Sequence, residues 1–424
     1  MFWIVLAVFI GLMLLRVRVA FALLAASLVY FVLAGVPLDI VASRIIATTQ
    51  SFPLLAIPLF ILAGNLMNAT GMTNRLFRFA ELLLGRIPGA LGHVVVSVGM
   101  VMAGTSGSAI ADAAALSRVA IPEMERLGYP RAFSASICAF AATMGPLIPP
   151  SIMFIVYGWL ANVSINRLFV AGAIPGILVG VFMFVTIYII SRRNSYGVVA
   201  KRATSQEVWQ SFLDAVWAMV MPVVILGGIV IGAFTATEAA AVAVGYALLV
   251  GLLVYRSLNL PIMVGAVQET VRTSMSIMFV VAAAYPFGWI LTAEQVPLAL
   301  LDAATALSVS PAVVLLVVNL VLLLLGMVME STSILLIVVP ALVPLMKALG
   351  VDLVHFGVMV TANLLLGTIT PPFGILMFTT CAIGKVSTVA FQKASVPFYI
   401  AFLLLLLLVT YVPAVSLWLP SVIF

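Results

Sequence analysis

Long apolar runs, separated by short polar or glycine-containing segments, follow one another along the whole chain. Runs of about 20 apolar residues predict helices that cross a bilayer, because a helix of that length spans the hydrocarbon core. The period-two alternation of membrane β-strands is absent. We therefore predict an all-α polytopic membrane protein. Uninterrupted spans are expected near Met1–Leu15, Val19–Val36, Phe52–Ala69, Arg167–Ile190, Val216–Phe234, Glu238–Tyr255, Arg272–Leu291 and Val396–Val412.

Two segments in the first half interrupt this pattern. Residues 91–121 form two apolar arms of about thirteen residues each around the tip Gly104–Ser108, and each arm is too short to cross roughly 30 Å of hydrocarbon. They predict a re-entrant hairpin that enters and leaves the bilayer on one side. The next apolar run, residues 132–160, is interrupted at Gly145–Pro150. Because proline removes a backbone donor and disfavours helix before it, this run predicts two half-helices joined by extended backbone.

The same interruptions recur in the second half at a fixed offset of 222 residues. They predict a second hairpin over about residues 311–345 and a second broken helix over 353–383. Residues 1–205 and 206–424 are thus two repeats of five spans and one hairpin each. Because five is odd, we expect inverted-topology repeats, an arrangement typical of transporters. The matched residues are Gly104 and Gly326, Pro122 and Pro344, Gly128 and Gly350, Gly145 and Gly367, Pro149 and Pro371, and Pro150 and Pro372.

Composition and charge narrow the class of function. Hydrophobic residues make up 65% of the 424 residues and charged residues 8%, which excludes an ordinary soluble domain. The net charge of +6 lies mainly in short loops such as the one with Arg192, Arg193, Lys201 and Arg202. There it sets membrane orientation, with the N-terminus outside, and does not indicate nucleic acid. The sequence contains no GxxxxGK[ST], HExxH or Gly-x-Ser-x-Gly motif, so we expect no enzyme.

The broken helices are the candidate binding elements. A helix broken at mid-membrane presents amides at one new end and carbonyls at the other, so it can bind a carboxylate and a small cation. Hard oxygen ligands without clustered carboxylates favour a monovalent cation, and we choose sodium. Alternatively, the prolines only kink packed helices and the glycines only permit close packing, although this does not explain two matched breaks with two matched hairpins. The candidate cation ligands are Thr105, Ser106, Ser108, Gly145 and Pro149, and then Gly326, Gly367 and Thr370.

Several acids and amides lie within apolar segments, where charge is costly and usually functional. Asp112 follows the first hairpin tip, Glu330 lies at the second, and Glu238 opens an alanine-rich span. The alternatives are a paired structural charge for Asp112 and helix N-capping for Glu238. Asn65 and Asn363 either hydrogen-bond a substrate or tie helices together.

Five short motifs are spread over the chain: Ala63-Gly64-Asn65, Ser106-Gly107-Ser108, Gly145-Pro146-Leu147-Ile148-Pro149-Pro150-Ser151, Thr237-Glu238-Ala239-Ala240-Ala241 and Gly367-Thr368-Ile369-Thr370-Pro371-Pro372. Together they resemble the large membrane subunit of the tripartite ATP-independent periplasmic (TRAP) transporters of bacteria and archaea. The resemblance covers essentially the whole chain. Each motif alone would be weak, but the combination is specific.

This resemblance implies a sodium-coupled importer of organic anions such as dicarboxylates, sialic acids or sugar acids. A transport domain with both hairpins and both broken helices would move like an elevator against a scaffold. The implied partners are a small four-helix membrane subunit and a soluble periplasmic binding protein, in the bacterial inner membrane with both termini periplasmic. By position, one sodium site would comprise Ser106, Ser108, Gly145 and Pro149, and the other Gly326, Gly367 and Thr370. Substrate would lie near Thr105, Pro150, Asn65, Asn363, Glu330 and Pro372.

Two features qualify these expectations. The Val328-Met329-Glu330 tip lacks the hydroxyls of the first tip, so the second cation site should depend more on carbonyls. No arginine falls within the expected core of the site, so the charge of the substrate is inferred from half-helix ends and from the resemblance. Two other functions stay open: a stand-alone sodium/dicarboxylate carrier that needs no binding protein, and a channel or scaffold subunit without a coupled ion.

Overall fold

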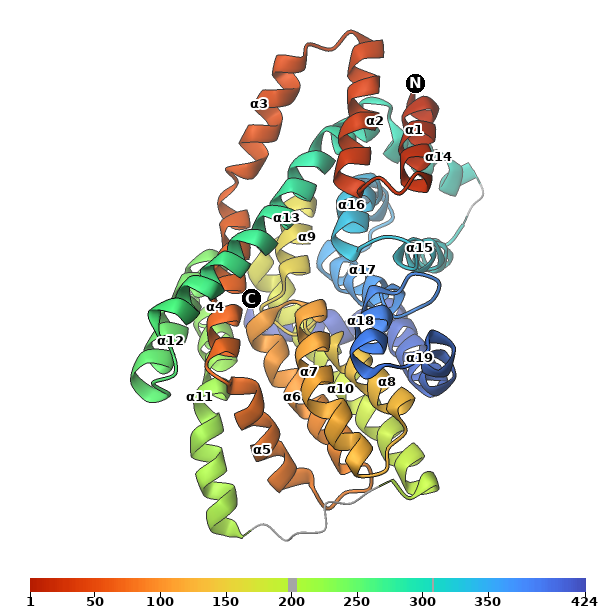
Figure 1. The fold of residues 1–424 in the computed structure, drawn as a ribbon. Coiled ribbons are helices and arrows are strands. Elements are labelled where there is room, and N and C mark those ends of the chain that lie inside the picture. The colour runs from red at the N-terminus through yellow and green to blue at the C-terminus, as the bar shows by residue number, and fades with distance from the viewer. Residues whose placement is uncertain (197–203, 307–308) are drawn as a thin grey trace.

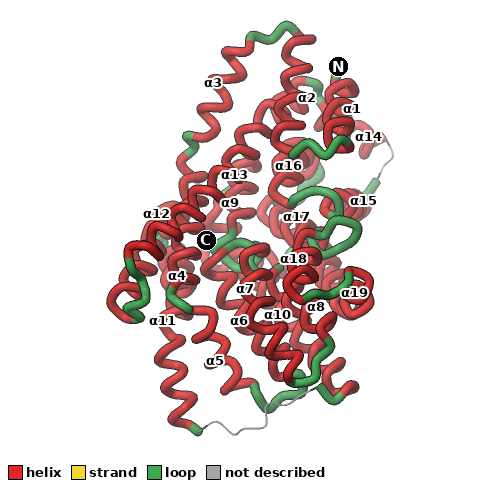
Figure 2. The backbone as a smooth tube through the Cα atoms, in the orientation of Figure 1, coloured by secondary structure: helices red, strands yellow, loops and turns green. Residues whose placement is uncertain are grey.

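The computed structural model describes residues 1–196, 204–306 and 309–424. All regular structure in these residues is helical (Figure 2), which confirms the all-α prediction. Lys201 and Arg202 of the predicted basic loop lie outside the described residues, and so does the side chain of Ser106.

Helices in the first half follow the apolar pattern closely. The helix Leu38–Thr49 was not predicted, because Asp39 and its threonines leave no apolar run of membrane length there. The helices are α1 (Phe2–Leu14), α2 (Val19–Ala34), α3 (Leu38–Thr49), the 3₁₀ turn η1 (Phe52–Leu55), α4 (Ala56–Ala69), α5 (Met72–Leu84), α6 (Ala90–Ser106), α7 (Ala109–Arg126), α8 (Arg131–Ala142), α9 (Ile152–Ala161) and α10 (Ile165–Asn194).

The order of elements in the second half is similar to that in the first. For example, α16 begins and ends 222 residues after α7. One helix, α13, however, stands where the first half has α3 and α4, and α20 has no counterpart. The helices are α11 (Ser205–Val230), α12 (Ala236–Leu249), the π turn η2 (Val250–Val254), α13 (Leu260–Ala293), α14 (Val296–Ala306), α15 (Pro311–Gly326), α16 (Ser331–Ala348), α17 (Leu353–Gly367), α18 (Ile375–Gly384), α19 (Thr388–Tyr411) and α20 (Ala414–Ile423).

Seven helical segments in the described residues are long and apolar enough to cross a membrane. Shorter apolar helices, among them the arm α15 and the half-helices on either side of the breaks, make up much of the remainder. The protein is therefore a multi-pass membrane protein. The seven segments are Phe52–Ala69, Ile165–Asn194, Ser205–Val230, Ala236–Val254, Leu260–Ala293, Ser331–Ala348 and Thr388–Tyr411.

α13 differs most from its predicted span, because it begins at Leu260 and not near Arg272. Asn259 caps this start by accepting a hydrogen bond from the amide of Ile262 at 3.0 Å, and Pro261 occupies the first turn. An N-cap asparagine followed by proline is a helix-start signal, so the start of α13 at Leu260 was predictable from the sequence. The extra turns, residues 260–271, contain the polar residues Gln268, Glu269 and Thr270 near their end, and these interrupt the apolar run before the predicted span begins at Arg272.

The helices pack in two groups (Figure 1). In one group, α12 packs on α4, and α13 packs on α2, α3 and α4. In the other, α7 packs on α8 and α18, α15 on α17, and α16 on α9. α13 crosses the molecule as one long helix and also packs against α16 of the second group.

Candidate functional site

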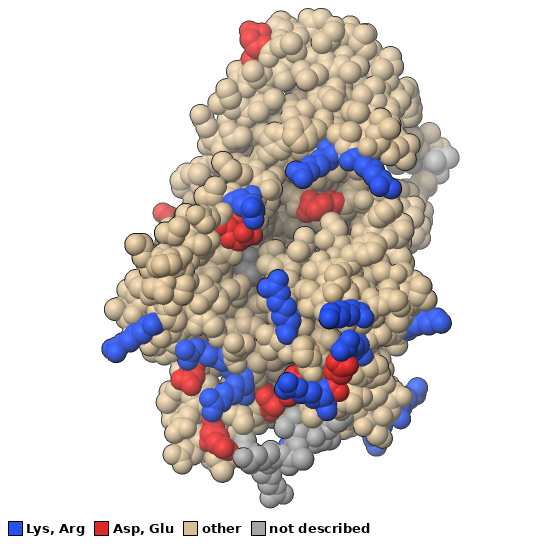
Figure 3. Space-filling model, viewed as in Figure 1, with Lys and Arg blue, Asp and Glu red and all other residues tan. Residues whose placement is uncertain are grey.

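A cavity of about 380 Å³ lies where the ends of both predicted hairpins and both breaks meet. Among the described residues, four helices begin at this cavity: α7, α9, α16 and α18. Figure 3 shows a hollow in the middle of the viewed face, with acidic atoms inside it and basic side chains around it. The lining residues are Gly107, Ser108, Ala109, Ile110, Pro146, Ile152, Met153, Arg272, Thr273, Ser276, Ile277, Glu330, Ser331, Thr332, Leu365, Thr368, Ile375 and Leu376.

Three of these four helix starts are fixed by side-chain caps. Ser108 accepts a hydrogen bond from the amide of Ala111 at 3.5 Å, and Glu330 accepts one from Ser333 at 3.1 Å. Ser151 caps α9 through the amide of Phe154. The remaining amides of each first turn point along the helix axis, so each helix start carries positive partial charge. Four such ends around one cavity make it attractive to an anion.

The first tip and the first break are in direct contact. A Cβ added at Gly107 would lie 3.0 Å from the carbonyl oxygen of Pro150. A Cβ added at Gly145 would lie 2.8 Å from Oδ2 of the buried Asp112, on α7. A side chain at Gly107 would press on the backbone of Pro150, and one at Gly145 would require the Asp112 carboxylate to move, so glycine permits the close approach of hairpin and break. Gly107 also ends α6 with φ of 59°, in the left-handed region.

The second tip and the second break meet in the same way. The amide of Phe373 donates to the carbonyl oxygen of Met327 at 3.1 Å, and Ser331 Oγ donates to that of Leu364 at 3.4 Å. α15 ends at Gly326 and α17 ends at Gly367, so two helix C-termini lie side by side. C-terminal carbonyls carry negative partial charge and suit a cation.

The predicted hydroxyl ligands are oriented by their own helices. Thr105 Oγ1 donates to the carbonyl oxygen of Met102 at 2.8 Å, and Thr370 Oγ1 donates to that of Leu366 at 2.7 Å. Each hydroxyl hydrogen is thus used, and the oxygen lone pairs remain as acceptors. Thr105 is fully buried and Thr370 half-buried.

The prolines of the predicted sites lie next to the cavity lining. Both Pro-Pro bonds, Pro149–Pro150 and Pro371–Pro372, are cis. Pro149 and Pro150 are buried, whereas Pro372 is exposed. The carbonyl oxygen of Pro149 lies 3.5 Å from where a Cβ of Gly104 would be, so the first break also touches the first arm of its hairpin.

Asn65 and Asn363 are not among the residues described as lining the cavity. Asn65 Nδ2 donates to Thr270 Oγ1 at 3.0 Å and joins α4 to α13. Asn363 Nδ2 donates to both the backbone oxygen and Oδ1 of Asn319 at 2.8 Å and joins α17 to α15. Both amides therefore tie helices together in this structure.

Glu238 behaves as the capping interpretation predicted. Its carboxylate accepts hydrogen bonds from the amide and hydroxyl of Thr235, each at 2.8 Å, while the Thr235 hydroxyl accepts from the amide of Glu238. This reciprocal arrangement is a capping box at the start of α12. The hydroxyl of Thr237 donates to the carbonyl oxygen of Phe52, which fastens the same turn to η1.

Arg272 is the lining residue that the sequence analysis missed. We expected no arginine in the core of the site, but Arg272 on α13 lines the cavity together with Thr273 and Ser276. Arg272 lines the cavity because α13 passes it with residues 272–277 of its first half.

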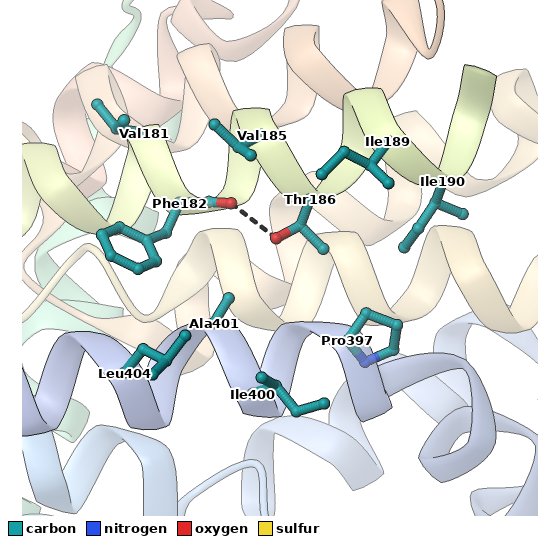
Figure 4. A pocket seen from close by; sticks show the side chains of 10 residues that line it. All are labelled: Val181, Phe182, Val185, Thr186, Ile189, Ile190, Pro397, Ile400, Ala401 and Leu404. Atoms are coloured by element: carbon teal, nitrogen blue, oxygen red, sulfur yellow. Dashed lines mark hydrogen bonds between the residues drawn. The ribbon is translucent and has the colours of Figure 1, made fainter. Parts of the chain in front are cut away.

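A larger cavity, of about 490 Å³, lies between α10 and α19 but has no comparable chemistry (Figure 4). Hydrocarbon side chains form most of its wall, including Val181, Val185 and Leu404. The hydroxyl of Thr186 donates to the carbonyl oxygen of Phe182 within α10, at 2.7 Å. A groove of this composition suits acyl chains and offers no binding group to a polar solute.

Comparison with known proteins agrees with this geometry. Residues 6–415 match the family model described as tripartite ATP-independent periplasmic transporter, DctM component. The sialic acid TRAP transporter large permease protein SiaM of Vibrio cholerae is 38% identical over 413 residues, which are 97% of this chain and 96% of that protein. The C4-dicarboxylate TRAP transporter large permease protein DctM of Pseudomonas aeruginosa is 41% identical over 380 residues, 90% of this chain and 89% of that protein.

A solved structure shares the fold at low sequence identity. The YdaH transporter of Alcanivorax borkumensis superposes with a TM-score of 0.62 and 15% identity over 88% of each chain. The family match over nearly the whole chain and the identity to two large permeases together identify the chain as a member of the DctM family, the large permease component of tripartite ATP-independent periplasmic transporters.

Proposed function

We propose that this chain carries a small organic anion across the bacterial inner membrane, with the anion bound in the cavity between the two hairpin tips. The observation that carries the proposal is the convergence of α7, α9, α16 and α18, whose first turns all line one cavity. The relatives named for sialic acid and C4-dicarboxylates transport organic anions of this kind. A channel or scaffold subunit would have no need of such a site.

Sodium is the proposed coupling ion. One site would use Ser106, Ser108, Gly145 and Pro149, and a second would use Gly326, Gly367 and Thr370. The meeting of the C-termini of α15 and α17 supports the second site, because carbonyl oxygens replace the hydration shell of a small cation. Coupling to a sodium gradient would drive uptake without ATP.

The proposed mechanism is an elevator motion between inverted repeats, residues 1–205 and 206–424. The pattern of helix packing supports it. The hairpin and broken-helix segments contact one another extensively, α12 packs on α4, and α2 and α4 pack on α13, which reaches the hairpins through α16. The helices α2, α4, α12 and α13 would be the scaffold, and the hairpins and broken helices would be the transport domain.

The proposed transporter has two further components, a small four-helix membrane subunit and a periplasmic binding protein that delivers substrate. Both termini of this chain would be periplasmic. Of the predicted substrate residues, Glu330 lines the cavity and would contact substrate. Thr105, Pro150 and Pro372 would shape the tips and breaks behind the described lining, and Asn65 and Asn363 would act through the helices that they join. A stand-alone sodium/dicarboxylate carrier is the competing proposal, and the family match favours the tripartite one.

Uptake into proteoliposomes tests these proposals directly. The chain and its small partner would be reconstituted with an inward sodium gradient and radiolabelled organic acids, with and without the binding protein. We expect uptake to need both sodium and the binding protein. Uptake with sodium alone would favour the stand-alone carrier, and uptake by a folded complex without any sodium gradient would exclude the assigned ion sites.

A further inference from the structure

The cavity combines one basic and one acidic side chain among its described lining residues, Arg272 and Glu330. Arg272 is at the mouth, with 83% of its side chain exposed, whereas Glu330 is half-buried at the tip of the second hairpin. The ion pairs found in the described residues do not join these two groups. Arg272 instead lies 3.9 Å from Glu269, one turn earlier on α13. Both charges therefore face the cavity without neutralising each other in a close pair.

Glu330 is held in place by its role as the N-cap of α16. Its Oε2 accepts hydrogen bonds from the amide of Ser333 at 3.1 Å and from its hydroxyl at 3.3 Å. The carboxylate cannot swing towards the mouth without giving up this cap. The equivalent position in the first repeat is Ser108, which caps α7 without a charge. The tip of the second hairpin thus places a fixed carboxylate where the first has a neutral hydroxyl.

An ionised carboxylate only accepts hydrogen bonds, so a ligand group that faces Glu330 must be a donor. A second anionic group on the ligand would instead face a like charge, which is unfavourable at close range. Arg272 offers a planar donor set that matches a carboxylate or sulfonate. The hydroxyls of Thr273 and Thr332, which also line the cavity, can both donate and accept. Ser276 donates its hydroxyl hydrogen to the carbonyl oxygen of Arg272 at 3.0 Å and adds an acceptor.

We infer that this cavity selects a singly charged, hydroxylated acid over an unsubstituted dicarboxylate. Arg272 binds the anionic group at the mouth, and Glu330 accepts a hydrogen bond from a ligand hydroxyl and rejects a second carboxylate. The inference rests on the proposed transport of an organic anion and assigns its chemical class from two side chains. Arg272 and Glu330 are therefore specificity-determining residues of the permease itself, separate from the selectivity of any binding protein.

A protection assay on the purified full chain measures this selectivity without a binding protein. Ile110 lines the cavity and is 45% exposed, so Ile110→Cys provides a thiol there, in a background of Cys138→Ala and Cys381→Ala that removes the two buried native thiols. The rate at which a maleimide alkylates this thiol would be followed against increasing gluconate, glucuronate and succinate, with sodium present. The concentration of each acid that halves the rate gives its relative affinity.

In the parent we expect gluconate and glucuronate to protect at lower concentrations than succinate. Glu330→Gln keeps an acceptor for the Ser333 cap but removes the charge, and should lower the half-protecting concentration of succinate about tenfold relative to glucuronate. Arg272→Gln should raise the half-protecting concentration of every acid about tenfold or more. Glu269→Gln, beside Arg272 but not among the described lining residues, is the matched control and should leave the ratio unchanged.

Three results would overturn the inference. They are a parent that prefers succinate, a succinate-to-glucuronate ratio that stays within about twofold of the parent in Glu330→Gln, and an equal shift in Glu269→Gln. If Glu330→Gln unfolds, Glu330→Ser is the second variant. It introduces serine, the residue at the equivalent position 108 and a good helix N-cap without charge. Failure of all acids to protect the parent thiol would also reject the organic-anion site, whereas protection with an unchanged ratio rejects the specificity alone.

Discussion

Gly326, at the end of α15, and Gly367, at the end of α17, lie against each other where the second hairpin meets the second broken helix. A Cβ placed on Gly367 would be 2.6 Å from Cα of Gly326, and one placed on Gly326 would be 3.0 Å from Cα of Gly367. Real Cβ atoms do not approach backbone so closely, so both residues must be glycine for the two helix ends to meet. Any side chain here would move the carbonyls that form the proposed second sodium site.

Gly367→Ala should therefore weaken both the fold and sodium binding. We expect a destabilisation of about 1–3 kcal/mol from overpacking and a higher sodium concentration for half-maximal uptake. Thermal unfolding in detergent and sodium-dependent uptake measure the two effects. Gly265→Ala is the control, because a Cβ there meets open space and alanine is the better helix former. Equal sodium dependence of the two variants would argue against a cation between α15 and α17.

Thr370→Val tests a single proposed ligand of the same site. The valine side chain has nearly the same shape but lacks the oxygen, whose hydrogen is already given to Leu366. We expect the sodium concentration for half-maximal uptake to rise about tenfold, which corresponds to roughly 1.4 kcal/mol. Thr379→Val removes a hydroxyl with the same intrahelical hydrogen bond, to Ile375 at 2.8 Å, away from the break. Unchanged sodium dependence in Thr370→Val would remove this residue from the site.

A disulfide between α13 and α16 should stop transport without unfolding the protein. A Cβ on Gly288 would lie 3.8 Å from Cβ of Pro340, a separation that a disulfide accommodates. With both native cysteines replaced by alanine, Gly288→Cys with Pro340→Cys would join the proposed scaffold to the proposed transport domain. We expect oxidation to abolish uptake and reduction to restore it.

The matched control joins two helices of the same packing group. A Cβ on Gly384 would lie 3.7 Å from Cβ of Ala135, so Gly384→Cys with Ala135→Cys links α18 to α8. Uptake should survive this cross-link, because both helices would move together. Normal uptake by a verified α13–α16 cross-link would contradict the elevator proposal.

Glu294 should give the fold a measurable dependence on acid pH. It follows α13, and its carboxylate accepts hydrogen bonds from the hydroxyl of Tyr30 at 2.9 Å and from the amide of Phe2 at 3.2 Å. These hydrogen bonds, that of Tyr30 foremost, hold the pKa of Glu294 below its ordinary value. A lowered folded-state pKa gives stability that is present above the unfolded-state pKa of about 4.3 and is lost as pH falls through the folded-state value.

Glu294→Gln should therefore lower the unfolding temperature at neutral pH and make its decline in acid shallower. Unfolding temperatures measured between pH 3 and pH 7 would show this change. Asp302→Asn replaces another exposed acid, on α14, and serves as the control for a general effect of charge. A parallel decline in the parent and Glu294→Gln would mean that this contact contributes nothing to stability.

The elements of this fold were largely predictable because bilayer thickness and proline chemistry act locally. The breaks at Gly145–Pro150 and after Gly367 follow from residues that cannot continue a helix, and the structure places α8, α9, α17 and α18 around them. The 222-residue offset indicated which segments correspond. Helix α3 escaped prediction because its residues have neither membrane length nor a strong apolar run.

The tips and breaks around the cavity and the acid Glu330 were predictable from the sequence, whereas Arg272 was not. Sequence spacing indicated that tips and breaks belong together, and the contacts of Gly107 and Gly326 fit that expectation. The presence of Arg272 depends on how α13 passes the cavity, which is a tertiary relationship between segments far apart in the chain. Asn363 is a second example. Its position in an apolar helix could not distinguish a substrate ligand from a hydrogen bond to Asn319 that joins two helices.

The first turn of α18 follows Gly374 and lines the cavity, as do the first turns of α7, α9 and α16. In the described residues, no side chain caps α18. The amide of Leu376 there donates to the backbone oxygen of Thr368 at 3.0 Å. Main-chain groups thus supply much of the polarity at this wall, and alanine scanning leaves main-chain groups in place. Alanine substitutions along the start of α18 would therefore leave the polarity of this wall intact, whereas inserting a single residue before Ile375 would turn the start of α18 away from the cavity and abolish transport.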